Sequence, residues 1–468
     1  MIMEKMRIPC GLLFMGLVVT CLATFPYLTI GDTPASPKTI IVPDNYLDIQ
    51  AAIGNASSGD TIFVRNGVYK VQDYYGVLID KPLTLIGEDN QNTIINASKP
   101  YYPHQMIRIT ADNVTVSGFN INGGGLAAGI IVEDSYSHVP IGCKIVGNNI
   151  HNCESTGIIA YGSTNTFTGE IKYLPSYLTI KGNTITENKG YGIYMSASNS
   201  TITENIIDSN NNVGIIVDEC LFVNITNNRI SNNGLAPYSE NQSGGVWLRW
   251  WGPFYVTGNN ITGNHGHGIG FGEFCNNSTI SENEISYNNI GVCKYLVMYA
   301  GKSNFVYQNN IIGNQRQVVV NQSLYSANNY TQVDAVAFNS SHTGNYWSDY
   351  FTRYPNACEV ASSGIGDTPY VVDSNNIDYH PLVQQVDSEQ TLKPSPTPTV
   401  TPTSIATPTP SPSTNPKTNP AESLITQDSP TPTSIIPEFH FAAIMTLLTI
   451  LLLASTLISY LKTAKLHK

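Results

Sequence analysis

The sequence has few charged residues, since Asp, Glu, Lys and Arg make up 12% of its 468 residues. Acidic side chains outnumber basic ones by 34 to 23, and the formal net charge is -11. A chain with so little positive charge lacks the basic face that nucleic-acid binding requires. The composition therefore excludes nucleic acid as a partner and is typical of a module with a neutral or weakly acidic surface.

Cysteine and methionine are scarce as well, with eight of each. Cys10 and Cys21 lie in the apolar N-terminal segment, and no Met-rich or Cys-His cluster occurs elsewhere. His265 and His267 share one short segment but have no further metal ligands nearby in the sequence, so we expect no metal site. Disulfides are permitted in an external compartment, and the pair that we favour is Cys143 with Cys153.

A helical 3.6-residue periodicity is absent, and a shorter repeat takes its place. Seven copies of Asn-x-Ile recur at spacings of 22 to 35 residues, beginning at Asn148, Asn183, Asn205, Asn228, Asn259, Asn283 and Asn309. Each copy is followed by a small residue and an apolar triplet, and the shortest spacing, from 183 to 205, is 22 residues. Short β-favouring runs punctuated by Asn and Gly at such a period indicate a solenoid.

A repeat of this length fits one coil of a parallel β-helix and is too short for a helix pair or a propeller blade. Equivalent residues of successive coils then stack about 4.8 Å apart, so that Ile packs on Ile and Asn forms an inward amide ladder at a turn. We place this all-β solenoid at residues 39–329, with loops inserted around Tyr161–Ser176 and Leu235–Gly244. A short amphipathic helix at Tyr46–Ala56, with Asp44 as its N-cap, is expected to cover the open end of the core.

The two ends of the chain predict export and anchoring. Residues 1–29 are typical of a secretory signal, and residues 391–437 form a Pro-, Thr- and Ser-rich stalk. Phe439 to Leu461 is long enough to cross a membrane, and the Lys residues of 462–468 predict that this tail is cytoplasmic. The body is therefore expected on the external face of the membrane, in agreement with Asn-x-Ser/Thr glycosylation sequons that include Asn55, Asn96, Asn113, Asn199, Asn224, Asn260 and Asn321.

Several segments carry a resemblance to known proteins. Ile49–Ile53, Gly59–Val64, Gly67–Tyr69 and the Asn-x-Ile coils resemble right-handed parallel β-helix proteins of the pectate-lyase-like type. The region 330–390 is more specific, because it resembles the terminal signature of NosD-like β-helix proteins, common among archaeal cell-surface proteins, at Gly344–Tyr350, Gly364–Tyr370 and Asp378–Leu382. The resemblance implies a right-handed β-helix closed by a C-terminal cap segment.

The same resemblance brings two metals into question, calcium and copper. Family members often carry an acidic Asp-x-Asp-x-Asp-Gly run that suits Ca²⁺, but this chain has Asn356–Ser363 at that place. Asp349, Asp367, Asp373 and Asp378 are instead expected to make turn and cap hydrogen bonds. We therefore expect no cofactor. Copper delivery is implied only by the family name.

Aligning the coils on their Gly residues separates core columns from an outward strip. The strip carries aromatic side chains that can stack on sugar rings, beside charged groups that can bind hydroxyls or acidic sugars. We predict ligand contacts from Tyr161, Tyr194, Trp247, Arg249, Trp250 and Trp251. A competing interpretation is that the insertion at residues 235–244 folds back and buries these aromatic side chains.

Three functions remain open. The favoured one is a surface protein with a binding or structural role towards glycan or envelope polysaccharide. The second is a polysaccharide lyase or glycoside hydrolase, for which the catalytic candidates are Asp218, Glu219, Arg249 and Glu273. The third is a copper-related accessory protein. An ion pair between Asp218 and Arg249, in adjacent coils of one column, is the simplest alternative to catalysis.

Overall fold

The computed structural model describes residues 36–71, 75–97, 104–124, 128–135, 138–162, 174–236, 243–295, 303–321 and 336–387. Within these ranges, no helix has the length and apolar character needed to cross a membrane. The predicted signal, stalk and membrane-spanning segments lie outside the described residues, as do most of the two predicted loop insertions.

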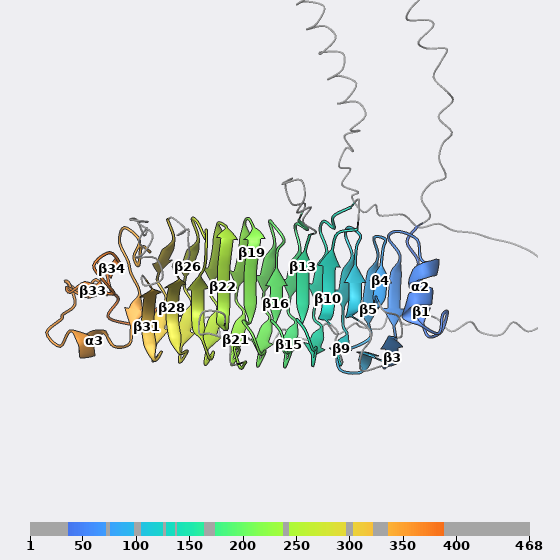
Figure 1. Cartoon of the computed structure of the whole chain (residues 1–468), viewed down its shortest axis with the longest axis horizontal. Helices are drawn as coiled ribbons and strands as arrows, with labels where there is room; N and C mark the ends of the chain where they lie inside the picture. The colour runs from blue at the N-terminus through green and yellow to red at the C-terminus, as the bar shows by residue number, and fades with distance from the viewer. Residues whose placement is uncertain are drawn as a thin grey trace, which may run out of the picture. The chain divides into compact units, whose positions relative to one another are not determined.

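The described chain folds into a parallel β-helix, which confirms the predicted fold class. Each coil contributes one strand to each of three sheets, and the coils follow one another in chain order (Figure 1). Sheet A contains β1 (Thr39–Val42), β2 (Thr61–Val64), β5 (Thr84–Gly87), β8 (Thr115–Ser117), β11 (Lys144–Val146), β14 (Thr179–Lys181), β17 (Thr201–Thr203), β20 (Val223–Thr226), β23 (Phe254–Thr257), β26 (Thr279–Ser281) and β29 (Phe305–Tyr307).

The other two sheets complete each coil. Sheet B contains β3 (Gly67–Val71), β6 (Thr93–Ala97), β9 (Asn120–Asn122), β12 (Asn149–His151), β15 (Thr184–Thr186), β18 (Ile206–Asp208), β21 (Arg229–Ser231), β24 (Asn260–Thr262), β27 (Glu284–Ser286), β30 (Asn310–Ile312) and β32 (Tyr346–Trp347). Sheet C contains β4 (Val77–Ile79), β7 (Gln105–Ile109), β10 (Ala128–Glu133), β13 (Ile158–Tyr161), β16 (Ile193–Met195), β19 (Ile215–Cys220), β22 (Gly244–Trp251), β25 (His267–Phe271), β28 (Ile290–Tyr295) and β31 (Arg316–Asn321).

Stacked aliphatic side chains form the core. In β17 the central Ile202 is fully buried, and it is in register with Ile180 below and Ile225 above. The flanking residues of each short strand point outwards, because side chains alternate along a strand. The period-2 alternation that the sequence shows within each coil therefore becomes one continuous hydrophobic column per sheet.

The Asn-x-Ile residues form the predicted amide ladder at the turn from sheet A to sheet B. The Asn205 side chain donates to the carbonyl oxygen of Ile180 at 3.0 Å and to Oδ1 of Asn228 at 2.9 Å, and its own Oδ1 accepts from Asn183. Every rung is buried with its amide bonded, which removes the cost of burying a polar group. The rungs are Asn148, Asn183, Asn205, Asn228, Asn259, Asn283, Asn309 and Asn345.

A second amide ladder, which the sequence analysis missed, lies at the turn after sheet B. Its rungs are Asn188, Asn210, Asn233, Asn264, Asn288 and Asn314. The signal was present, since each of these residues lies five positions after an Asn-x-Ile asparagine. In the earlier coil that begins at Asn148, Cys153 takes the same place, and its backbone N–H donates to Oδ1 of Asn188 at 3.0 Å.

Helix α2 (Ile49–Asn55) covers the N-terminal end of the core with Ile49, Ala52 and Ile53. Its N-cap is Asp48, whose side chain accepts from the backbone N–H of Ala51 at 2.7 Å. This corrects the prediction of Asp44, which instead forms an ion pair with Arg65 at 2.8 Å. The reason is local: an N-cap carboxylate bonds the amide two or three residues into the helix, and only Asp48 has that spacing.

The C-terminal segment caps the other end with β32, the short helix α3 (Tyr350–Arg353) and the hairpin of β33 (Tyr370–Val371) and β34 (Ile377–Asp378). The last ladder residue, Asn345, donates its backbone N–H to Asp378 at 2.8 Å, and the indole of Trp347 donates to the same carboxylate oxygen. As predicted, the aspartates of this segment make turn and cap hydrogen bonds.

Candidate functional site

The outer face of sheet C carries the predicted strip, and the strand register confirms how its columns align. Ile216 is in register with Trp247, and Asp218 with Arg249, across β19 and β22. The preceding coil supplies Tyr194 in β16, in register with Ile216. Neighbours in one column are therefore one strand spacing apart, about 4.8 Å.

Asp218 is the centre of one hydrogen-bonded group on this face. Its Oδ2 accepts from Nη2 of Arg249 at 2.8 Å and from the hydroxyl of Tyr194 at 2.8 Å. Asp218 is 3% exposed, whereas the Arg249 side chain is 38% exposed. Burial, together with the charge of Asp218, raises the pKa of Tyr194 well above its usual value, so this phenol remains a proton donor.

A second group of the same composition lies three strands away, in the earlier coils of sheet C. Glu133 in β10 accepts from Arg108 in β7 and from the hydroxyl of Tyr161 in β13. Burial, followed by the contact with Glu133, raises the pKa of Tyr161. Sequence analysis missed Arg108, because it lies in a coil without the Gly-apolar triplet, although it alternates with the buried Ile107 and Ile109.

Trp247 is 8% exposed, so most of its ring is covered by the protein itself. Its ring centroid lies 4.8 Å from that of His267, within a second hydrophobic cluster that includes Ile216, Ile290 and Cys293. The next coil has Gly270 and Gly272 at this place, and a Cβ on Gly272 would meet the Trp247 indole nitrogen at 2.8 Å. The glycines leave the space into which the tryptophan packs.

Trp250 and Trp251 lie at the end of β22, where sheet C turns towards sheet A. Trp250 packs against Phe274 with 4.9 Å between ring centroids, and Trp251 is 44% exposed. Their φ angles are 55° and 88°, a left-handed conformation that is unusual for bulky side chains. Glu219 occupies the place of Trp250 in the preceding coil. The backbone N–H of Trp250 donates to the backbone oxygen of Glu273 in the next coil.

The catalytic candidates thus divide into two sets. Asp218 and Arg249 are joined in one ion pair, while Glu219 is the next residue along β19 and Glu273 follows the end of β25. Glu273 is separated from Asp218 by the whole of β22. The structure therefore brings together Tyr194, Asp218 and Arg249, and places Trp250, Trp251, Glu219 and Glu273 at the adjacent corner.

The favoured disulfide is wrong, because Cys143 and Cys153 are both free thiols. Cys143 precedes β11 of sheet A and Cys153 follows β12 of sheet B, so the two side chains enter the core at different corners of one coil. Burial raises the pKa of Cys143 to about 11 and that of Cys153 to about 12. In the described ranges no three His, Cys, Asp or Glu side chains gather as a metal site would require.

Comparison with known proteins gives two family matches. Residues 53–248 match the family described as periplasmic copper-binding protein (NosD), and residues 176–336 match the family described as right handed beta helix region. No curated protein matches the chain.

Solved structures share low identity with it. ORF18 of Geobacillus virus E2 has 13% identity and a TM-score of 0.46, and the match covers 68% of this chain and 64% of ORF18. An alginate lyase from a Paenibacillus species has 16% identity and a TM-score of 0.45, over 61% of this chain and 99% of the lyase. The family matches and the three-sheet coil together lead to one assignment. The described chain has the fold of a right-handed parallel β-helix, and its residues 53–248 are similar to the NosD family.

Proposed function

We propose that this protein binds a polysaccharide along the outer face of sheet C. The observation that carries the proposal is the pair of Arg-carboxylate-Tyr groups on that face, centred on Glu133 and Asp218. Sheet A presents mostly Thr, Ser and Asn at the equivalent outward positions. Guanidinium and phenol groups can donate to sugar hydroxyls and carboxylates, while the exposed ring of Trp251 offers a surface for stacking.

The same groups favour binding over catalysis. A lyase or hydrolase needs a carboxylate, or another base, that can take up or release a proton during the reaction. Asp218 is bonded to Arg249 and Tyr194, and Glu133 is bonded to Arg108 and Tyr161, so each carboxylate is already paired with an arginine and a tyrosine of the protein itself. The phenols have raised pKa values and do not serve as bases near neutral pH.

A copper-related role is the alternative that the family description suggests. Copper sites use His, Cys or Met side chains that converge on one point. Among the described residues, Met106 and Met195 are fully buried in separate coils, and the Cys143 and Cys153 thiols have raised pKa values. These donors do not fit a copper site, so the glycan-binding proposal is preferred.

The proposed location is the external face of the cell membrane, and it rests on the sequence of the two chain ends. An apolar segment at Phe439 to Leu461 after a Pro- and Thr-rich stalk is typical of a C-terminal anchor. A chain that ends at Leu392 is expected to remain in the soluble fraction, whereas the full chain sediments with membranes. Equal sedimentation of the two chains would contradict the anchor.

Retention on a polysaccharide array tests the binding face. Trp251→Ala removes an exposed ring and is expected to reduce retention at least tenfold, because stacking and the adjoining hydrogen bonds act together. Its matched control is Tyr255→Ala, which removes a ring of similar exposure, 38% against 44%, from the outer face of sheet A. Unchanged retention for Trp251→Ala, or an equal loss for both variants, would refute the proposal.

A further inference from the structure

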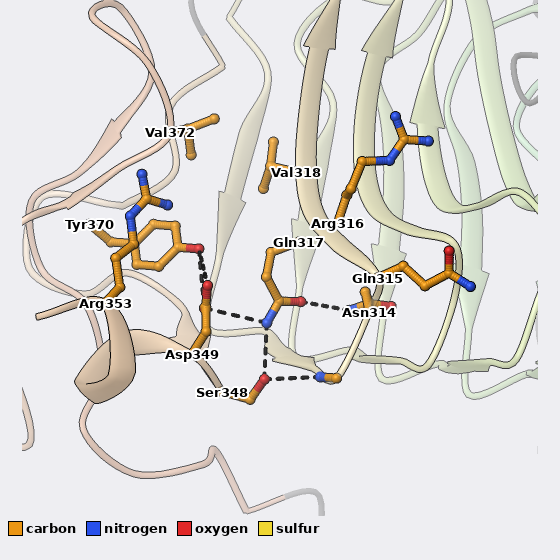
Figure 2. Close-up of a pocket in the computed structure, with 11 residues that line it drawn as sticks. Asn314, Gln315, Arg316, Gln317, Val318, Ser348, Asp349, Arg353, Tyr370 and Val372 are labelled. Carbon is orange, nitrogen blue, oxygen red and sulfur yellow. Dashed lines mark hydrogen bonds between the residues drawn. The ribbon is translucent and has the colours of Figure 1, made fainter.

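A pocket of about 500 Å³ lies where the last described coil meets the C-terminal cap. Figure 2 shows Arg316 and Gln317 at the start of β31 on one side of it, and Arg353 and Tyr370 of the cap on the other. Its volume falls within the range of about 300–1,000 Å³ that is usual for small-molecule sites. It is remote from the proposed polysaccharide face in the sequence, since none of its lining residues belongs to β7 through β22.

The solenoid supplies a polar floor. Gln317 donates from Nε2 to Oγ of Ser348 at 2.9 Å, and its Oε1 accepts from Nδ2 of Asn314 at 3.0 Å. Asn314 is the last rung of the second amide ladder, so this floor is the bonded end of that ladder. The Gln317 side chain is thereby fixed in position before any ligand arrives.

The cap holds a guanidinium at the opposite wall. Arg353 donates from Nη2 to the carbonyl oxygen of Val371 at 2.7 Å, and its guanidinium carbon lies 4.8 Å from the centre of the Tyr370 ring. Trp347 stacks on Tyr370 with 4.1 Å between centroids and 3° between planes. Two groups at these distances must occupy opposite faces of the ring, so Tyr370 has no face left for a sugar. A ligand in this pocket is recognised by charge and hydrogen bonds.

The lining charge selects the ligand class. Arg316 and Arg353 supply two positive charges and Asp349 one negative charge, a balance of +1 in a chain whose formal net charge is -11. Asp349 accepts from the Tyr370 hydroxyl at 3.0 Å and from Gln317 at 3.4 Å, which leaves acceptor capacity on its two oxygens. Guanidinium groups bind carboxylates, and a carboxylate such as Asp349 accepts from hydroxyl groups.

We propose that this pocket binds a hydroxylated carboxylate, in the form of an acidic sugar unit. The carboxylate would lie towards Arg353, a sugar hydroxyl would donate to Asp349, and Arg316 on the opposite wall would donate to another oxygen of the sugar. This inference rests on the proposed function, because it gives the glycan a chemical class and a second point of contact at the end of the solenoid.

Calorimetric titration of the full chain with galacturonate, galactose and acetate tests the ligand class. Galactose has the ring hydroxyls without the carboxylate, and acetate has the carboxylate without the hydroxyls. Galacturonate is expected to bind at least tenfold more tightly than either. No binding of galacturonate, or acetate binding as tight as that of galacturonate, would overturn the proposal.

Two variants test the residues. Arg316→Gln and Arg353→Gln are each expected to weaken galacturonate binding about tenfold, the effect of losing one charge-assisted hydrogen bond. Arg229→Gln, on the exposed face of β21, is the matched control and is expected to bind as the unaltered chain does. Arg353 also contacts Tyr354 and Tyr370, so thermal unfolding of each variant is recorded, and Arg316→Gln provides the result if Arg353→Gln loosens the cap.

The two proposals fail in different ways. Trp251→Ala is expected to lose polysaccharide retention while galacturonate affinity stays unchanged, since Trp251 does not line the pocket. Galacturonate affinity that survives in both arginine variants would overturn the pocket assignment and leave the sheet C proposal standing.

Discussion

The turn from sheet A to sheet B has a constant length, whereas the turn from sheet C to sheet A varies in length from coil to coil. In the coils from β11 to β30, the first turn always spans three positions, as from Val146 to Asn149 or from Thr203 to Ile206. The second turn spans three positions from Cys220 to Val223 but 18 from Tyr161 to Thr179. The difference shows which part of a coil is constrained by the coils above and below it.

The constraint is the buried amide ladder. Each Asn completes its hydrogen bonds only if the next coil presents another amide at the same height, so an insertion at this turn would leave buried donors and acceptors unbonded. Among the described residues, the turn after sheet C has single polar contacts between coils but no continuous amide ladder. It accepts insertions and exposed aromatic residues, including Tyr177, Phe222 and Trp251, at 60%, 48% and 44% exposure.

The largest effect is expected from Asn228→Leu, which interrupts the ladder in its middle. Asn228 donates to Ile202 and Asn259 and accepts from the backbone and side chain of Asn205. Loss of these bonds in a fully buried place should lower the free energy of unfolding by about 3 kcal/mol or more, measured by urea unfolding followed by circular dichroism.

Asn224→Ala serves as its control, since Asn224 points outwards from β20. A change within about 0.5 kcal/mol is expected there. Equal losses for Asn224→Ala and Asn228→Leu would mean that the ladder does not distinguish the two positions.

A smaller, pH-dependent effect is expected at the end of the ladder. Burial raises the pKa of Asp378 from 3.8 to about 6 in the folded state, against the hydrogen bonds that it accepts. The folded chain then holds an extra proton between about pH 4 and 6, so this group's contribution to stability is present below pH 4 and lost as pH rises through 6. The loss is about 2–3 kcal/mol at most.

Urea midpoints of the unaltered chain and of Asp378→Asn, compared at pH 4.5 and 7, measure this contribution. The amide does not titrate, so the variant should lose this part of the pH dependence. If both chains keep the same pH dependence, Asp378 is not the responsible group.

The smallest effect, of opposite sign, is expected at the turn after sheet C. Phe222 has a φ of 56°. The residue at the same turn of the preceding coil is Asn199, which has nearly the same φ, 54°. Asn adopts this conformation more readily than a bulky residue, so Phe222→Asn should raise the free energy of unfolding by up to about 1 kcal/mol. Phe222→Val should lower it, and a thermal scan of both variants checks the order. Destabilisation by Asn would show that the Phe222 ring contributes to the fold.

Sequence reasoning predicted the parts of the molecule that repeat. The fold, the core columns and the first ladder follow from Asn-x-Ile, because stacking forces like residues into register. The second ladder was missed although Asn188 and Asn210 stand at a constant distance from the first. Exposure was harder to predict, because the burial of Trp247 depends on Gly270 and Gly272 in a different coil. Arg108 was missed because its coil lacks the Gly-apolar triplet by which the other coils were aligned. The pocket beside Tyr370 depends on contacts between segments that no periodicity relates.

The first amide ladder also gives the solenoid a polarity. Each Asn side-chain oxygen accepts from the coil before it, so a coil that ends the stack presents a row of donors and acceptors to whatever comes next. Asn345 and Asp378 close that row, and the carbonyl oxygen of Phe338 receives the last amide. The C-terminal cap therefore covers the hydrogen-bonding groups of the last coil. As a result, the first coil of a second molecule cannot stack on the end of the solenoid.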